Sequence, residues 1–319
     1  MTSARAAIIV SGLSKKFGAL RAVNELSFDV HPGEIFGLVG PDGAGKTTTL
    51  RMLAGVLAPD SGSAIVADHD VRRDPEGAKH QLSYMSQRFG LYEDLTVYEN
   101  IRFYADLFGV GREKREQRSA ELLAAAGLSE FRKRLAGNLS GGMKQKLGLV
   151  CALIHTPRVL LLDEPTNGVD PISRRDFWRI LYSLVAEGVA ILASTSYLDE
   201  AERCHRVGLL HEGRMLFCDR PDELRKRFPG AVLAIRATEP ARVRDVLAKA
   251  LAVHSALLVG DRVHLFVDDA ATSLPDMCAR LDAEGLVYTS IEAVTPSIED
   301  LFVSAVEGES SGTGQTRVP

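Results

Sequence analysis

The chain has 319 residues and a formal net charge of −4, with 45% hydrophobic and 25% charged residues, an ordinary globular composition for about two domains. Basic residues are not gathered in excess, which argues against a nucleic-acid partner. The four cysteines fall in no paired spacing, which argues against a disulfide framework or a zinc site and favours a reduced compartment.

Neither the N-terminus nor any apolar run predicts export or membrane insertion. Residues Met1 to Ala7 lack the charged-then-apolar pattern of a secretory signal. The longest nearly apolar run, Leu147 to Ile154, is far shorter than the ~20 residues that a membrane helix needs. We therefore expect a chain that does not cross a membrane by itself.

Two strands are predicted near the N-terminus, at Ile8 to Val10 and at Leu26 to Val30. Between them, Phe17 is either a core aromatic or a platform for a purine ring, and its residue type alone favours the core.

A phosphate-binding loop is predicted after the apolar run Ile35 to Val39, which is typical of a buried strand. The pattern G-x-x-x-x-G-K-[ST] is matched in full by Gly40, Pro41, Asp42, Gly43, Ala44, Gly45, Lys46 and Thr47. Glycines let successive N–H groups point at a phosphate, and the helix predicted from Thr48 adds partial positive charge at its start. Lys46 would reach the β- and γ-phosphates, and the Thr47 hydroxyl would coordinate Mg²⁺. The alternative is an ordinary glycine turn, but the flanking strand and helix favour the site.

Ser140 marks a predicted helix start that follows a mostly helical stretch. Apolar residues from Val97 to Phe108 repeat at helical spacing, and helical character continues from Glu113 to Ala126. Ser140 is a good N-cap, and Gly141 and Gly142 leave N–H groups open where an anion can bind. On these residues alone, a turn and a binding site are equally supported.

Two adjacent carboxylates, Asp163 and Glu164, end the apolar run Val159 to Leu162, which is typical of a strand buried on both faces of a parallel sheet. Neighbouring residues of a strand point to opposite sides, so we expect different roles for the two. In a phosphoryl-transfer site Asp163 would hold Mg²⁺ and Glu164 would polarise the attacking water. An exposed acidic strand end is the alternative, and the upstream phosphate loop favours the site.

A second domain is expected at residues 229–306, after a first domain at 1–228. Its predicted elements follow the order β-α-β-β-α-β, with Gly260-Asp261 as a hairpin loop, which is typical of a small ferredoxin-like α+β domain. Residues 307–319 are polar and glycine-rich, and we expect them to be disordered.

In this order the motifs of the first ~225 residues resemble the nucleotide-binding domain of ATP-binding cassette (ABC) transporters. The phosphate loop is similar to Walker A, Val159 to Glu164 to Walker B, and Leu139 to Met143 to the family signature. Gln87 takes the place of the Q-loop glutamine, and Gly168-Val169-Asp170 resembles the D-loop. The resemblance implies an α/β P-loop ATPase core with a helical subdomain at about 88–156.

The resemblance also implies the ligands and their residues. ATP would be held by Phe17 stacked on adenine, by the phosphate loop with Thr48, and by Ser140, Gly141 and Gly142. Mg²⁺ would be held by Thr47, Gln87 and Asp163. Catalysis would rest on Glu164, Lys46 and Gln87, with Ser196 at the switch position.

Three further sequence stretches are similar to those of bacterial ABC-2 type exporters. Gln87 to Tyr92 and Ser194 to Glu200 resemble the N-terminal half of tandem multidrug-efflux ATP-binding proteins. The stretch from Pro296 to Phe302 is similar to the C-terminal extension common in ABC-2 ATPases. This implies a cassette that dimerises with a second ATP-binding subunit, identical or not. It further implies membrane permease subunits and a place on the cytoplasmic face of the inner membrane.

Two residues depart from the family pattern. Asp42 stands where most members carry Asn, and we expect it on the outer side of the loop. Ser196 replaces the switch histidine and lacks the reach to contact both the γ-phosphate and Glu164, so slow hydrolysis is expected at this chain's own site. Ser196 keeps open the alternative of a regulatory subunit that binds ATP without hydrolysing it. A soluble ABC ATPase with no transport role is a separate alternative.

Overall fold

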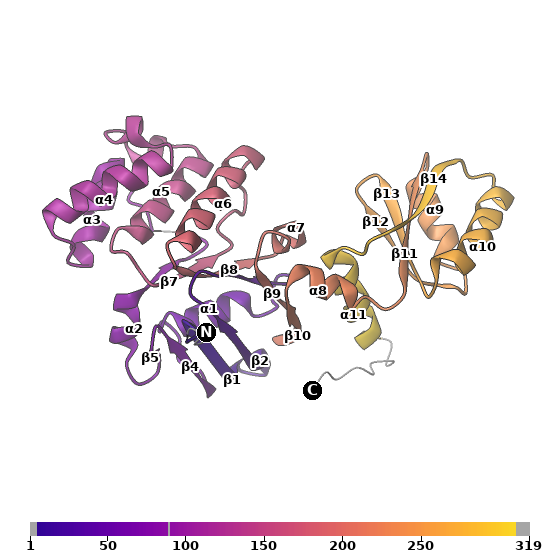
Figure 1. The fold of residues 1–319 in the computed structure, drawn as a ribbon, viewed down its shortest axis with the longest axis horizontal. Helices are drawn as coiled ribbons and strands as arrows, with labels where there is room; N and C mark the ends of the chain where they lie inside the picture. The colour runs from indigo at the N-terminus through magenta and orange to yellow at the C-terminus, as the bar shows by residue number, and fades with distance from the viewer. Residues whose placement is uncertain (1–4, 89, 311–319) are drawn as a thin grey trace. The chain divides into compact units, whose positions relative to one another are not determined.

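The computed structural model describes residues 5–88 and 90–310. The chain divides into two compact units, of which the first ends at Arg220 and the second begins at Pro221 (Figure 1). This division lies before residue 228, the boundary expected from the sequence. The reason is that helix α8 (Pro221–Lys226) packs against α11 (Ile298–Ser310), both in the second unit. Because α11 extends to Ser310, residues 307–310 of the expected disordered tail are helical, and residues 311–319 lie outside the described part.

The first unit is built on a six-stranded sheet with the strand order β10-β9-β3-β8-β7-β6. Its strands are β3 (Ile35–Val39), β6 (Leu82–Met85), β7 (Val159–Asp163), β8 (Ala190–Thr195), β9 (Arg206–His211) and β10 (Arg214–Asp219). Pairing is parallel from β9 to β6, and β10 runs antiparallel to β9. Because every residue of β3, β7 and β8 is buried, their apolar runs lie at the centre of the unit, as the sequence predicts.

A second, antiparallel sheet of the first unit has the order β2-β1-β4-β5. Its strands are β1 (Ile8–Phe17), β2 (Leu20–Val30), β4 (Ser61–Val66) and β5 (His69–Asp70). Apolar residues of this sheet, of α1 (Lys46–Leu53) and of one face of the six-stranded sheet form one buried core that includes Leu26, Leu50 and Leu161. Helix α2 (Pro75–Gln81) leads from β5 into β6.

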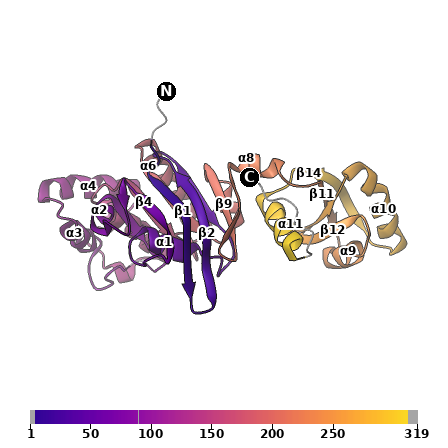
Figure 2. The same cartoon turned by 90° about the horizontal axis from the view of Figure 1, so that it is seen from below.

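Between β6 and β7 the chain is helical. It forms α3 (Val97–Leu107), α4 (Arg112–Ala125), two short 3₁₀ turns (Ser129–Phe131 and Ala136–Asn138) and α5 (Gly141–Leu153). Thr96 and Glu99 form a reciprocal capping box at the start of α3. Helix α6 (Pro171–Ala186) packs against α5, and the short α7 (Leu198–Ala201) follows β8 (Figure 1). Figure 2 shows the same elements from below.

The second unit carries the element order β-α-β-β-α-β predicted from the sequence. Its elements are β11 (Ala231–Ala237), α9 (Pro240–Leu247), β12 (Val253–Val259), β13 (Arg262–Val267), α10 (Ala270–Ala283) and β14 (Tyr288–Val294). The strands form an antiparallel sheet in the order β12-β13-β11-β14, the arrangement of a ferredoxin-like domain. Leu233, Val263 and Leu281 lie in the buried core of this unit.

A buried carboxylate joins α11 to the sheet of the second unit. Asp300 is fully buried, and its Oδ2 accepts hydrogen bonds from the backbone and hydroxyl of Ser297, the residue before α11, both at 2.8 Å. Nδ1 of His264, on β13, lies 3.0 Å from Oδ1 of Asp300. Burial raises the pKa of Asp300, but the hydrogen bonds with His264 and Ser297 outweigh it and hold this pKa below its ordinary value.

In the part of the chain that the structure describes, no helix combines the length and apolar character needed to span a bilayer.

Candidate nucleotide site

The phosphate loop connects the end of β3 to the first residue of α1, and two of its glycines are required by close backbone contacts. Gly45 has φ of 101°, and a Cβ there would lie 2.3 Å from the carbonyl oxygen of Ala22. At Gly40 a Cβ would lie 2.3 Å from the carbonyl oxygen of Leu210. Any side chain at either position would therefore displace the loop from β2 or β9.

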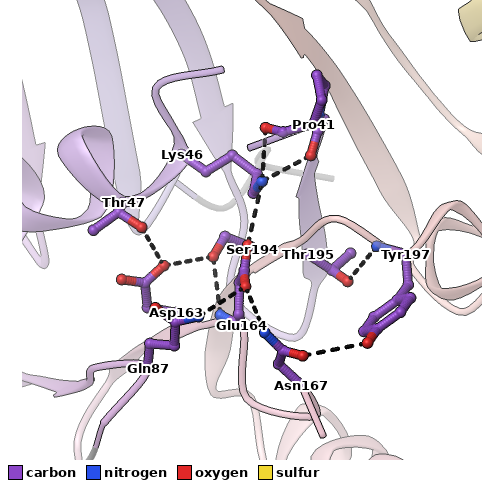
Figure 3. A network of polar contacts seen from close by, with 11 residues as sticks. Pro41, Lys46, Thr47, Gln87, Asp163, Glu164, Asn167, Ser194, Thr195 and Tyr197 are labelled. Atoms are coloured by element: carbon purple, nitrogen blue, oxygen red, sulfur yellow. Dashed lines mark hydrogen bonds and ion pairs between the residues drawn. The ribbon is translucent and has the colours of Figure 1, made fainter. Parts of the chain in front are cut away.

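Lys46 places a buried ammonium group at the centre of this loop (Figure 3). Its Nζ donates to the carbonyl oxygens of Gly40 at 2.7 Å and Pro41 at 3.0 Å, and it lies 3.3 Å from Oε1 of Glu164. A buried ammonium group needs such partners, since an unpaired charge in the interior is costly. The Lys46 ammonium group can therefore exchange its anionic partner Glu164 for another anion.

Asp163 ends β7 and is the other buried acid of the site. Its Oδ1 accepts hydrogen bonds from the hydroxyls of Thr47 at 2.9 Å and Ser194 at 2.8 Å (Figure 3). Its Oδ2 accepts a hydrogen bond from the hydroxyl of Tyr84 at 3.1 Å. Burial, together with the charge of Asp163, raises the pKa of Tyr84 to about 12, so this hydroxyl remains a donor. These three hydroxyls fix the carboxylate beside the first turn of α1.

Glu164 has a different set of partners. It has a φ of 47°, which is uncommon for a residue with a side chain, and its backbone N–H donates to the carbonyl oxygen of Ser194 at 3.1 Å. Besides Lys46, its carboxylate contacts two amides: Nε2 of Gln87 and Nδ2 of Asn167 each lie 3.2 Å from Oε2. Adjacent acids on one strand end therefore contact different elements, and strained backbone at such a point is frequent in functional sites.

The oxygen donors around Thr47 suit a small hard cation. The hydroxyl of Thr47 and Oδ1 of Asp163 are 2.9 Å apart, and Gln87 has an amide oxygen besides the nitrogen that contacts Glu164. Mg²⁺ is commonly bound by one or two carboxylates together with phosphate oxygens rather than by a full protein cage. The hydroxyl of Thr47 and the carboxylate of Asp163 therefore fit a magnesium ion, with the Gln87 amide oxygen as a further candidate ligand.

The structure places the remaining predicted residues at the edges of this cluster or apart from it. Phe17, the last residue of β1, is 49% exposed, so it is not a core aromatic. Asp42 is exposed on the loop, and Thr48 is partly buried in α1. Ser196 directly follows β8 and is partly buried.

The signature residues lie at the start of α5, outside the network drawn in Figure 3. Ser140 is the N-cap predicted from the sequence, and its hydroxyl accepts a hydrogen bond from the N–H of Met143 at 3.3 Å. Gly141 and Gly142 form the first turn, with Gly141 exposed and Gly142 buried.

Sequence reasoning missed five residues of the polar network around Asp163 and Glu164: Tyr84, Ser194, Asn167, Thr195 and Tyr197. A usable signal was present for two of them. Tyr84 lies near the carboxyl end of β6 and Ser194 near that of β8, the two strands that flank β7 in the sheet. Carboxyl ends of parallel strands meet at one edge, so these residues could be placed beside Asp163 once the strand order was known.

Comparison with known proteins agrees with this geometry. Residues 23–167 match the protein family described as ABC transporter. The chain is 47% identical over 98% of its length to the probable multidrug ABC transporter ATP-binding protein YbhF of Escherichia coli, and it spans 54% of that relative. It is 35% identical to the daunorubicin resistance ATP-binding protein DrrA2 of Streptomyces coeruleorubidus, covering 93% of this chain and 94% of the relative.

Solved structures show the same fold for the first unit. An ATP-binding subunit of an ABC transporter is 32% identical and superposes with a TM-score of 0.64, covering 70% of this chain and 93% of that one. An ATP-binding cassette in its ADP conformation, at 23% identity and a TM-score of 0.63, shares the fold. The fold class predicted from the sequence, a P-loop ABC ATPase core, is thus confirmed, and the chain belongs to the ATP-binding proteins of the ABC transporter family.

Proposed function

We propose that this chain is the ATP-hydrolysing subunit of a bacterial ABC-2 type export complex. The observation that carries the proposal is the cluster in which Lys46 and Thr47 of the phosphate loop contact Glu164 and Asp163 at the end of β7. The relatives named for multidrug and daunorubicin resistance support the exporter class. Substrate choice would belong to membrane subunits, with this chain on the cytoplasmic face of the inner membrane.

Each residue of the cluster has a role in this proposal. Lys46 leaves Glu164 and the loop carbonyls to contact the β- and γ-phosphates, and N–H groups of the loop and of α1 bind the same oxygens. Mg²⁺, held by Thr47, Asp163 and Gln87, would neutralise charge on the phosphates. Glu164 orients and polarises the attacking water.

The proposed working unit is a dimer in which two cassettes enclose two nucleotides. Ser140, Gly141 and Gly142 would complete the partner's site, because they lie on α5 and not in the cluster around Lys46. The exposed Phe17 would stack on adenine, a role that its position at the end of β1 leaves open to a ligand. Permease subunits in the membrane would receive the resulting motion.

Substitution of Lys46 tests the nucleotide site. In Lys46→Ala the phosphates lose their buried cation, so we expect Mg-ATP affinity to fall about tenfold to a hundredfold in calorimetric titration, the range for a charged hydrogen bond. Lys79→Ala is a matched control, because Lys79 pairs with Glu76 on α2 at the surface. Equal ATP affinity in the two variants would contradict the proposed site.

A second candidate function is ATP binding without useful hydrolysis, and Ser196 is the observation that favours it. Serine at this position is shorter than the histidine that the family pattern carries. Single-turnover hydrolysis by the full chain separates the two functions, since a regulatory subunit would bind Mg-ATP and release no phosphate.

A further inference from the structure

The carboxylate of Glu164 is held from one side by a pair of residues, Asn167 and Tyr197, to which the family resemblance assigns no role. Nδ2 of Asn167 donates to Oε2 of Glu164 at 3.2 Å, and Oδ1 of the same amide accepts from the Tyr197 hydroxyl at 3.3 Å (Figure 3). Because Asn167 is exposed, packing does not fix its side chain. Its orientation is set by these two hydrogen bonds, one at each end of the amide.

Tyr197 is itself held in place by its surroundings. Its backbone N–H donates to Oγ1 of Thr195 at 3.0 Å, and the guanidinium of Arg174 lies 4.7 Å from the centroid of its ring. Arg174 is anchored in turn by Glu200, whose Oε1 lies 3.7 Å from its Nε. Glu200 is buried and also accepts hydrogen bonds from Thr166 and Trp178. The tyrosine hydroxyl is therefore a fixed point on the α6 side of the site.

The contact between Asn167 and Glu164 becomes important when Lys46 no longer contacts Glu164. The Glu164 carboxylate contacts the Lys46 ammonium group and two amides, those of Gln87 and Asn167. A Lys46 that contacts phosphates can no longer hold the carboxylate, so its direction then depends on the amides. A general base works only within hydrogen-bond reach and in the right direction.

We infer that Asn167 and Tyr197 are positioning residues for Glu164, with Tyr197 orienting the amide that orients the carboxylate. Tyr197 directly follows Ser196, whose side chain is too short for the switch role and leaves the carboxylate without that orienting group. This inference rests on the proposed role of Glu164 as the group that polarises water.

The test measures hydrolysis of Mg-ATP by the full chain under single-turnover conditions, together with ATP affinity by calorimetry. We expect Asn167→Ala and Tyr197→Phe each to lower the hydrolysis rate about threefold to tenfold, the range for one positioned hydrogen bond, with ATP affinity unchanged. Tyr197→Phe keeps the ring that contacts Arg174 and removes only the hydroxyl. The double variant should be no slower than Asn167→Ala, because Tyr197 acts through Asn167.

The Glu164→Gln background separates positioning from a merely structural role. There Asn167→Ala should leave the residual rate unchanged, whereas a structural defect would lower it by the same factor as in the wild-type chain. Tyr182→Phe is the matched control, since its hydroxyl donates to the backbone of Arg203 at 2.9 Å, outside the network.

Three results would overturn the inference: unchanged rates in both single variants, an equal loss in the Glu164→Gln background, or a parallel loss of ATP affinity. A Glu164→Gln chain that hydrolyses ATP normally would instead contradict the proposed role of Glu164.

Discussion

The contact between the first turn of α5 and the first turn of α6 yields a sharp prediction. A Cβ added at Gly142 would lie 2.4 Å from Oγ and 2.5 Å from Cβ of Ser173, and 3.3 Å from Oδ2 of Asp170. Real Cβ atoms do not approach other atoms so closely, and the Ser173 Cβ cannot rotate away. In Gly142→Ala one helix start must therefore move relative to the other.

The expected magnitude combines two opposed effects. Inserting a methyl group into a packed contact costs about 1–3 kcal/mol, and replacing Gly by Ala in a helix gains at most about 1 kcal/mol. A net loss of about 1–2 kcal/mol in a unit of this size corresponds to a fall of about 2–8 °C in Tm. Gly141→Ala supplies the control, because no atom lies within 4 Å of a Cβ at Gly141 and only the helix gain remains.

Thermal and urea unfolding of the full chain, followed by circular dichroism, measure these changes. The cost of Gly142→Ala should vanish in a Ser173→Gly background, since that change removes both crowded atoms. The reasoning is refuted if Gly142→Ala is as stable as Gly141→Ala, or if its cost is the same with Ser173 present or absent. Either result would mean that α5 and α6 are not held together by this contact.

Three further predictions concern other parts of the chain. The lowered pKa of Asp300 stabilises the folded chain above the unfolded pKa of about 3.9, and this contribution is lost as pH falls through the folded pKa. In Asp300→Asn, the free energy of unfolding measured by urea titration should therefore decrease less at acid pH than in the wild-type chain. A chain ending at Arg220 should bind Mg-ATP with unchanged affinity in calorimetry, because every contact around Lys46 lies in the first unit. Ser196→His should raise the rate of phosphate release by up to about 10²–10³-fold. In an assembled complex, Glu164→Gln should lower ATPase activity less than the matching change in the partner cassette does. An equal loss would mean that the two sites are equivalent.

The elements that the sequence predicts correctly have local signals. The apolar run from Ile35 to Val39 coincides with β3, and Ser140 caps α5 because its hydroxyl accepts a hydrogen bond three residues ahead. The Gly260-Asp261 turn joins β12 to β13, as a two-residue loop between apolar runs predicts. In each case the residues that determine the structure lie within a few positions of one another.

The missed features depend on contacts between distant residues. Strand β4 has the sequence SGSAIV and few apolar residues, and it forms because it pairs with β1 far back in the chain. Helix α8 has the sequence PDELRK, in which only Pro221 and Leu224 are uncharged, and it joins the second unit through α11. Likewise, only the folded sheet brings Ser194 to Asp163. Composition and spacing carry no information about such pairings.

The charges around Lys46 and Glu164 explain why we expect Ser196 to affect ATP hydrolysis at this site. The buried Lys46 ammonium group and the Glu164 carboxylate lie 3.3 Å apart, and the desolvation cost of such a buried pair makes it a poor source of stability. A bound phosphate would replace Glu164 as the partner of Lys46, which would leave the Glu164 carboxylate without a counter-ion beside further negative charge. A histidine at the switch position could donate to the phosphate and orient the carboxylate at once, whereas neutral amides from Gln87 and Asn167 can only orient it. Because ATP binding would depend on Lys46 and the loop rather than on Ser196, we expect a site that holds ATP more effectively than it cleaves it.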